Sequence, residues 1–336
     1  MKKFLFSLLS PSKSPLLPLL IGWAYFIIVS KDITGDIGRI SQVVFSKEYH
    51  LQSKFQDNLP TASVDYCGVN DLKYNTIVFL GDSFTFMIDY YTNSKSDYPD
   101  YLANIIQKKS AKFYAADISA EATFVALCNS NVLDSCVVVL ESAEKAFINR
   151  LYNLDFSSSF IPQAAKWPWP NYGKGTDFFT FYKNRLIDNH TVLNVSLCDS
   201  LFTCPRKETE LFFLQDDLLF PNEEQIQIAI SKLESIFRLA NEKRIQLFYV
   251  VAADKYDVYQ DFVIDNNYPK KNVLNGFYRF ESNPCFVNTR PLLYKKANEG
   301  VTDLYYADDS HWSTIGAKIV AEEIAKRMDS LGIFQN

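Results

Sequence analysis

Two stretches of the sequence, more than two hundred residues apart, contain side chains with complementary reactivity. Ser83 lies in the first, shortly after an apolar run that ends at Leu80. His311 lies in the second, behind Asp308 and Asp309, and is one of only three histidines in the chain. A serine hydroxyl attacks carbonyl groups when a histidine accepts its proton and a carboxylate orients that histidine. These residue types therefore predict covalent acyl chemistry, provided that the fold brings the two stretches together.

The surroundings of Ser83 are those of a residue at the edge of a sheet. Residues 76–80 predict a buried strand, Gly81-Asp82-Ser83 interrupts it, and a helix-like stretch follows from Phe84. Ligands of open α/β sheets bind at the carboxyl ends of the strands, and a helix N-terminus adds N–H groups and partial positive charge there. The N–H of Ser83 could then help to hold an oxyanion. The alternative is a plain turn in which Ser83 only caps the helix.

His311 directly precedes the last predicted helix, which spans residues 314–328 with Ser313 as its N-cap. A carboxylate two or three residues before a histidine can reach the imidazole ring when the segment forms a tight loop. Asp309 and Asp308 are therefore both candidates for the acid. The alternative is a structural or surface histidine.

The predicted elements alternate between strands and helices, which is typical of a doubly wound α/β fold with a parallel sheet. The runs at 76–80 and 136–140 are continuously apolar, as expected for strands that helices cover on both faces. Asn222 and Gln225 form a capping-box pattern at the start of a long amphipathic helix. The predicted strands are residues 76–80, 112–116, 136–140 and 245–251, and further helical segments start at Phe84 and cover 101–106 and 314–328.

Composition excludes several classes of protein. The net charge of −5 argues against a nucleic-acid-binding protein, which would carry a basic surface. The 11 glycines form no nucleotide-binding loop, so we expect no cofactor. The six cysteines show no zinc-type spacing, so we expect no metal site. These cysteines could form disulfides, and Cys198 and Cys204 are the pair closest in sequence. The alternative is that they remain buried thiols.

The N-terminus predicts a membrane anchor. Residues 14–30 form an uncharged run of 17 residues behind a basic tail, which is the lower limit for a spanning helix. No small-x-small cleavage site follows, so we interpret residues 1–31 as a cytoplasmic tail with an uncleaved signal anchor. A cleaved signal peptide is the alternative. Residues 32–70 would be a juxtamembrane lead-in, and 71–336 one domain with an irregular, aromatic insertion at about 155–220.

These motifs resemble those of a known superfamily. The GDSF segment and the D-x-x-H pattern before the last helix are similar to the SGNH (GDSL-type) hydrolases, and Trp312 after the histidine resembles the alginate O-acetyltransferase-like and "DHHW" branch. Residues 139–142, 253–259 and 289–292 also look similar to that branch. The resemblance implies a three-layer, flavodoxin-like sheet. It covers roughly 74–150 and 222–330.

The resemblance implies roles for individual residues. Ser83 matches the nucleophile and His311 the base. The acid is Asp308 in the pattern of ordinary SGNH hydrolases and Asp309 in the tryptophan-bearing branch, and Trp312 favours Asp309. The glycine and asparagine that usually complete the oxyanion hole are absent from 115–118 and 140–143. Further candidates for oxyanion or substrate contacts are Gly81, Asp82, Glu141, Lys255 and Trp312. Of these, Asp82 also looks like a structural residue of the turn, and Lys255 could instead orient the site.

The implied function is an O-acetyltransferase that acts on a cell-surface polysaccharide. By the same resemblance, a membrane-bound O-acyltransferase would supply the acetyl groups. The anchor would place the protein in the inner (cytoplasmic) membrane, with its catalytic domain in the periplasm or outside the cell. Trp167, Trp169 and Tyr172 could cover the site and stack on sugars, or merely pack the insertion. A deacetylase of surface glycan and a non-catalytic module of an export assembly are the alternative functions.

Overall fold

A computed structural model describes most of the chain from Val64 onward. The predicted anchor at 14–30, the histidines His50 and His190, and the insertion's Trp167, Trp169 and Tyr172 lie outside the described residues. Among the residues that are described, no helix is both long and apolar enough to cross a membrane. The described ranges are 64–86, 97–115, 118–133, 135–158, 160, 162–165, 192–270 and 273–334.

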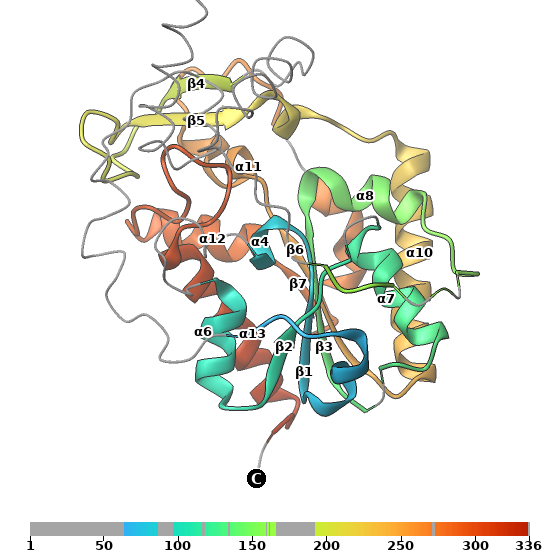
Figure 1. The fold of residues 1–336 in the computed structure, drawn as a ribbon. Helices are drawn as coiled ribbons and strands as arrows, with labels where there is room; N and C mark the ends of the chain where they lie inside the picture. The colour runs from blue at the N-terminus through green and yellow to red at the C-terminus, as the bar shows by residue number, and fades with distance from the viewer. Residues whose placement is uncertain are drawn as a thin grey trace, which may run out of the picture.

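A parallel sheet of five strands forms the centre of the molecule (Figure 1). Its order is β2-β1-β3-β6-β7, and every neighbouring pair is parallel. The expected α/β fold with a parallel sheet is therefore confirmed. The strands are β1 (Ile77–Leu80), β2 (Ser110–Lys112), β3 (Val137–Ala143), β6 (Gln246–Ala252) and β7 (Phe286–Asn288).

Helices cover both faces of this sheet (Figure 1). Successive residues of a strand point to opposite faces, so Phe79 packs in the apolar cluster on one side and Val78 in the cluster on the other. On the Phe79 side lie α6 (Tyr98–Ile106), α12 (Thr289–Asn298) and α13 (Thr314–Ser330). On the Val78 side lie α7 (Ala120–Asn129), α8 (Glu144–Tyr152) and α10 (Glu223–Glu242).

Side-chain caps fix the starts of the two longest helices. The predicted capping box is present at α10, where the Asn222 side chain accepts the Gln225 N–H and Gln225 returns a bond to the Asn222 N–H. At α13, the Ser313 hydroxyl accepts the N–H groups of Ile315 and Gly316. A Cβ at Gly316 would collide with the Leu304 carbonyl, so this glycine lets α13 approach the loop in front of it.

Three details differ from the predictions. The strand predicted at 112–116 is β2, which begins earlier, at Ser110, and ends at Lys112, because the residues that pair with β1 are 110–112. The strand predicted at 136–140 continues as β3 to Ala143, because β6 pairs with it along that whole length. β7 had no counterpart among the predicted strands.

The described part of the aromatic insertion is more regular than expected. β4 (Val192–Ser196) and β5 (Glu210–Leu214) form a separate antiparallel pair. This pair packs against the chain that follows β6, where the Cys198 N–H donates to the Phe262 carbonyl at 2.8 Å and the Ile264 N–H to that of Ser196 at 2.9 Å. The shorter elements are α4 (Ser83–Phe86), α11 (Lys255–Tyr259) and the 3-10 helices η2 (Val69–Tyr74), η3 (Gln215–Leu218), η4 (Gln260–Phe262) and η5 (Val273–Phe280).

Candidate active site

Ser83 lies where the strand order of the sheet reverses. The chain moves outward from β1 to β2 and then crosses back to β3 on the other side of β1. Such a reversal separates the connections at the carboxyl ends of the strands and leaves the crevice in which α/β proteins bind ligands. Ser83 is the first residue of α4, directly beyond β1, and is partly exposed. The sheet thus presents its hydroxyl at this crevice.

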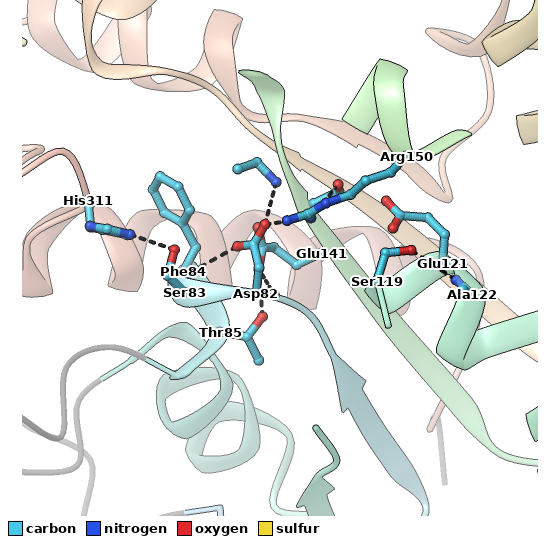
Figure 2. Close-up of polar contacts among 12 residues, drawn as sticks. Asp82, Ser83, Phe84, Thr85, Ser119, Glu121, Ala122, Glu141, Arg150 and His311 are labelled. Atoms are coloured by element: carbon cyan, nitrogen blue, oxygen red, sulfur yellow. Dashed lines mark hydrogen bonds and ion pairs between the residues drawn. The ribbon is translucent and has the colours of Figure 1, made fainter. Parts of the chain in front are cut away.

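Ser83, His311 and Asp309 form one chain of hydrogen bonds. The Ser83 Oγ lies 2.6 Å from His311 Nε2, and His311 Nδ1 lies 2.6 Å from Asp309 Oδ1 (Figure 2 shows the first contact). The same Asp309 oxygen accepts the backbone N–H of His311 at 2.9 Å. With a proton on Nδ1, Nε2 is free to accept the serine proton. This arrangement can activate the hydroxyl for attack on a carbonyl group.

The structure distinguishes the two aspartates by their contacts with the imidazole. Asp309 is the carboxylate bonded to Nδ1, and it is fully buried while the His311 side chain keeps 14% of its surface exposed. Asp308 is also buried. The backbone N–H of Asp309 donates a hydrogen bond to the Tyr306 carbonyl oxygen. The histidine can therefore meet a substrate while its carboxylate partner is shielded from water.

Trp312 follows His311 directly and is deeply buried beside the histidine loop. It keeps only 2% of its surface exposed, and its Nε1–H donates to the Tyr305 hydroxyl at 3.1 Å. Its ring packs on Phe84, with centroids 4.7 Å apart, and Phe84 also contacts the His311 ring. Neighbouring aromatic rings cover Trp312 in this conformation, and a contact between Trp312 and substrate stays a prediction.

Asp82 holds the turn that carries Ser83. Its Oδ2 accepts the Ala143 N–H at 3.0 Å and an Arg150 guanidinium N–H at 2.7 Å, and its Oδ1 accepts the Phe84 N–H at 3.3 Å. Burial would raise the pKa of Asp82, but the Arg150 charge and these hydrogen bonds hold that pKa below its ordinary value. Figure 2 shows Asp82 between Ser83 and Arg150. Its contacts fit the structural reading of this residue, and they occupy both oxygens that would otherwise face a substrate.

Glu141 lies beneath the same turn, inside β3. Its Oε2 accepts the Asp82 N–H at 3.0 Å and the Thr85 hydroxyl at 2.8 Å. Burial, followed by the negative charge of Asp82, raises the pKa of Glu141 well above its ordinary range. No part of Glu141 is exposed, and its hydrogen bonds go to the turn that carries Ser83; a contact with substrate stays a prediction.

Gly81 is required by the packing of this turn. A Cβ at Gly81 would overlap the Thr85 hydroxyl and lie 2.7 Å from Glu141 Oε2. The absence of a side chain lets β1 pass close to β3 at the point where the chain turns into α4. Gly81 thus acts through close approach, and its predicted place in the oxyanion or substrate group finds no support in these contacts.

Lys255 is completely buried. Its Nζ donates to the carbonyl oxygens of Tyr306, Ala307 and Asp309, all in the loop before His311. These bonds agree with the expectation that Lys255 orients the site, whereas a direct contact between Lys255 and a glycan stays a prediction.

Arg150 is the polar residue at this site that sequence reasoning missed. It lies on α8, and its side chain is one-quarter exposed. Its guanidinium bonds to Asp82 and, at 3.1 Å, to the Ser142 hydroxyl, which joins the ends of β1 and β3. Nothing in the local sequence marks it, because its partner Asp82 lies 68 residues earlier in the chain.

Neither a metal centre nor a disulfide is found in the described part of the chain. No group of three or more His, Cys, Asp or Glu side chains there is arranged to hold a metal ion. All six cysteines fall within the described ranges and none of them forms a disulfide, so Cys198 and Cys204 are not bonded to each other.

Comparison with known families supports an SGNH-like domain. Residues 209–335 match a family described as "SGNH hydrolase-like domain, acetyltransferase AlgX". The match confirms the predicted resemblance over this stretch, which contains Lys255, Asp309 and His311 but begins after Ser83. It supports an SGNH-like role of the acetyltransferase or hydrolase kind. No curated protein and no solved structure matched the chain.

Proposed function

We propose that this protein is an O-acetyltransferase that acetylates a cell-surface polysaccharide through an acetyl-serine intermediate. The observation that carries the proposal is the hydrogen-bonded chain of Ser83, His311 and Asp309 at the crevice of the sheet. The family match supports this kind of reaction, because the family is described as an acetyltransferase domain. The matched residues 209–335 include His311 and Asp309. The proposal joins these two findings.

In the first half-reaction, Ser83 Oγ attacks the carbonyl carbon of an acetyl ester while His311 Nε2 takes the serine proton. The carboxylate of Asp309 stabilises the resulting imidazolium. The tetrahedral intermediate then collapses, the bond to the donor oxygen breaks, and His311 returns the proton to that oxygen. Ser83 is left as its acetyl ester.

In the second half-reaction, a sugar hydroxyl replaces the departed donor. His311 takes the proton of this hydroxyl as its oxygen attacks the acetyl-serine carbonyl. The intermediate collapses by release of Ser83 Oγ, which regains the proton from His311. Transfer prevails over hydrolysis when water is kept from the acetyl-serine, so the site needs a cover once the acceptor is bound.

The Ser83 N–H is the candidate donor for the oxyanion in both half-reactions. It lies in the first residue of α4, on the same residue as the nucleophile. Loss of one oxyanion donor from a hydrolase costs ~10²–10³ in rate. The glycine and asparagine that usually share this task are absent from 115–118 and 140–143, so the Ser83 N–H would act with another donor.

The remaining parts of the proposal rest on the sequence. The uncharged run at 14–30 would anchor the chain in the cytoplasmic membrane, with the catalytic domain on the outer side. A membrane-bound O-acyltransferase in the same membrane would then deliver the acetyl group, since no coenzyme-binding motif occurs in the chain. The acceptor would be a polysaccharide of the cell surface.

An esterase that removes acetyl groups from a glycan is the second candidate. It is favoured by the order of the motifs, because Ser83 precedes His311 as in ordinary SGNH hydrolases. Both enzymes need the same three residues, so the fate of the acetyl group must distinguish them.

The test incubates the full-length protein with an aryl acetate as donor, with and without oligosaccharide acceptors. Transfer predicts an acetylated oligosaccharide and an acetyl group on Ser83 by mass spectrometry, and both disappear in Ser83→Ala. Free acetate alone, unaffected by acceptors, would support the esterase. Ser231→Ala, an exposed change on α10, is the control and keeps wild-type activity. Wild-type behaviour of Ser83→Ala in this assay and in polymer acetylation in cells would refute both enzymes and leave the non-catalytic module.

A further inference from the structure

We infer that Lys255 is a positioning residue that holds the loop of Asp309 and His311 in register with Ser83. Its effect on catalysis rests on the proposed function, but its effect on the geometry of the histidine does not. Lys255 is the first residue of α11, three residues beyond the end of β6. It is therefore fixed to the central sheet.

The ammonium group binds the inner side of the loop. Nζ lies 2.7 Å from the Tyr306 carbonyl oxygen, 2.9 Å from that of Ala307 and 3.1 Å from that of Asp309. An ammonium group has three N–H donors, so these three carbonyl groups match its capacity. The ring of Phe202, from the segment between β4 and β5, covers the same ammonium at 5.1 Å from the ring centre.

The loop and the lysine depend on each other energetically. A buried ammonium is strongly unfavourable unless hydrogen bonds replace its water. A buried carbonyl group left without a donor is also unfavourable, because it has lost its hydrogen bonds with water. Three carbonyl groups that converge on one point would repel each other without a donor between them. Removal of the ammonium should therefore open the loop, because this conformation directs all three oxygens inward.

Asp309 links this loop geometry to the reacting hydroxyl. Its backbone carbonyl accepts from Lys255, and its side-chain carboxylate accepts from His311 Nδ1 and from the His311 N–H. A displacement of the Asp309 backbone thus moves the imidazole relative to Ser83. Misplacement of a catalytic group by about 1 Å can cost about 10²-fold in rate.

A second contact fixes the same loop to the same part of the sheet. The Tyr305 hydroxyl donates to the Ala253 carbonyl at 2.6 Å, two residues before Lys255. Tyr305 also pairs with Trp312 across the base of the loop. The loop is therefore fixed at its base by Tyr305 and drawn inward by the three hydrogen bonds from Lys255.

The experiment compares Lys255→Met with Lys232→Met in the full-length protein. Methionine keeps the length and volume of lysine but has no donor. Lys232 is a matched control, because its Nζ also donates to a carbonyl, that of Leu154 at 2.8 Å, and lies over the ring of Phe156, but on α10. The chain has only three histidines, so ¹⁵N-histidine labelling resolves the imidazole signals, and His311→Gln assigns the one of interest.

We expect Lys255→Met to shift or broaden the His311 imidazole signal and to lower kcat by about 100-fold with little change in KM. Lys232→Met keeps the wild-type signal and kcat. In an Asp309→Asn background, Lys255→Met should cost much less, because the lysine acts through Asp309. A folded Lys255→Met with the wild-type signal and kcat overturns the inference, and so does a full additional loss in the Asp309→Asn background.

Lys255→Arg keeps the test decisive if the methionine variant does not fold. Arginine retains the buried charge, but its planar donors cannot point at three converging carbonyl groups as an ammonium does. We expect a folded protein with a displaced His311 signal, and a wild-type signal and kcat would overturn the inference. If the wild-type protein transfers no acetyl group at all, the proposed function fails, while the imidazole signal still tests Lys255.

Discussion

Replacement of Glu141 by Gln removes a buried titrating group but keeps its hydrogen bonds. Glu141 Oε2 accepts from the Asp82 N–H and from the Thr85 hydroxyl, and the oxygen of a glutamine can accept from both. The amide nitrogen of that glutamine can also donate toward the Asp82 carboxylate. The two side chains have nearly the same shape, so the main difference between the proteins is the proton that Glu141 can bind.

The expected effect is a change in the pH dependence of stability. Burial and the charge of Asp82 raise the pKa of folded Glu141 well above its ordinary value of 4.5. Between these two values the folded protein holds a proton that the unfolded chain has released. Its free energy of unfolding therefore falls by about 1.4 kcal/mol for each pH unit of increase. Glu141→Gln lacks this contribution, so its stability relative to wild type rises with pH by that amount per unit as long as folded Glu141 keeps its proton.

Urea unfolding of both proteins between about pH 5 and 8 measures this difference, in a range above the ordinary pKa of carboxyl groups. Glu224→Gln, at the exposed start of α10, removes the same charge from the surface and controls for net charge. The result that would refute the reasoning is a difference between Glu141→Gln and wild type that stays constant with pH. Glu141 would then be ionised in the folded protein, despite its burial beside Asp82.

Two further predictions concern the turn and the histidine loop. Asp309→Asn should lower kcat for acetyl transfer by about 10⁴-fold, because it replaces the carboxylate that is bonded to His311 Nδ1. Asp308→Asn should lower kcat much less. A larger loss of kcat in Asp308→Asn than in Asp309→Asn would contradict the assignment of the acid. Gly81→Ala should lower the free energy of unfolding by about 1–3 kcal/mol, because the added Cβ would overlap the Thr85 hydroxyl. An unchanged thermal unfolding midpoint would contradict this prediction and show that the turn accommodates the methyl group.

The sequence alone predicted those features that depend on neighbouring residues. The apolar run at β1, the Asn222 capping box of α10 and the Ser313 cap of α13 all form as expected. Each is a local signal, because a cap or a buried strand needs only the right residue types within a few positions. The same applies to the choice of Ser83 and His311, whose positions next to a predicted strand and a predicted helix follow from such signals.

Short elements and strand ends were harder to predict for the opposite reason. β7 has three residues and is a strand because β6 lies beside it. Glu141 and Ser142 continue β3 although they are polar, and groups from Asp82, Thr85 and Arg150 donate hydrogen bonds to Glu141 Oε2 and to the Ser142 hydroxyl. These partners come from other parts of the chain, so no local pattern announces them.

Only the tertiary structure decided what each candidate side chain contacts. The hydroxyl of Ser83 and the imidazole of His311 are separated by 228 residues, and the parallel sheet brings them to one edge. The burial of Glu141, Lys255 and Trp312 likewise depends on elements that pack over them from distant parts of the chain. Residue type and spacing determine which chemistry is available to this protein, whereas packing determines which of those groups reach the crevice and which hold the others in place.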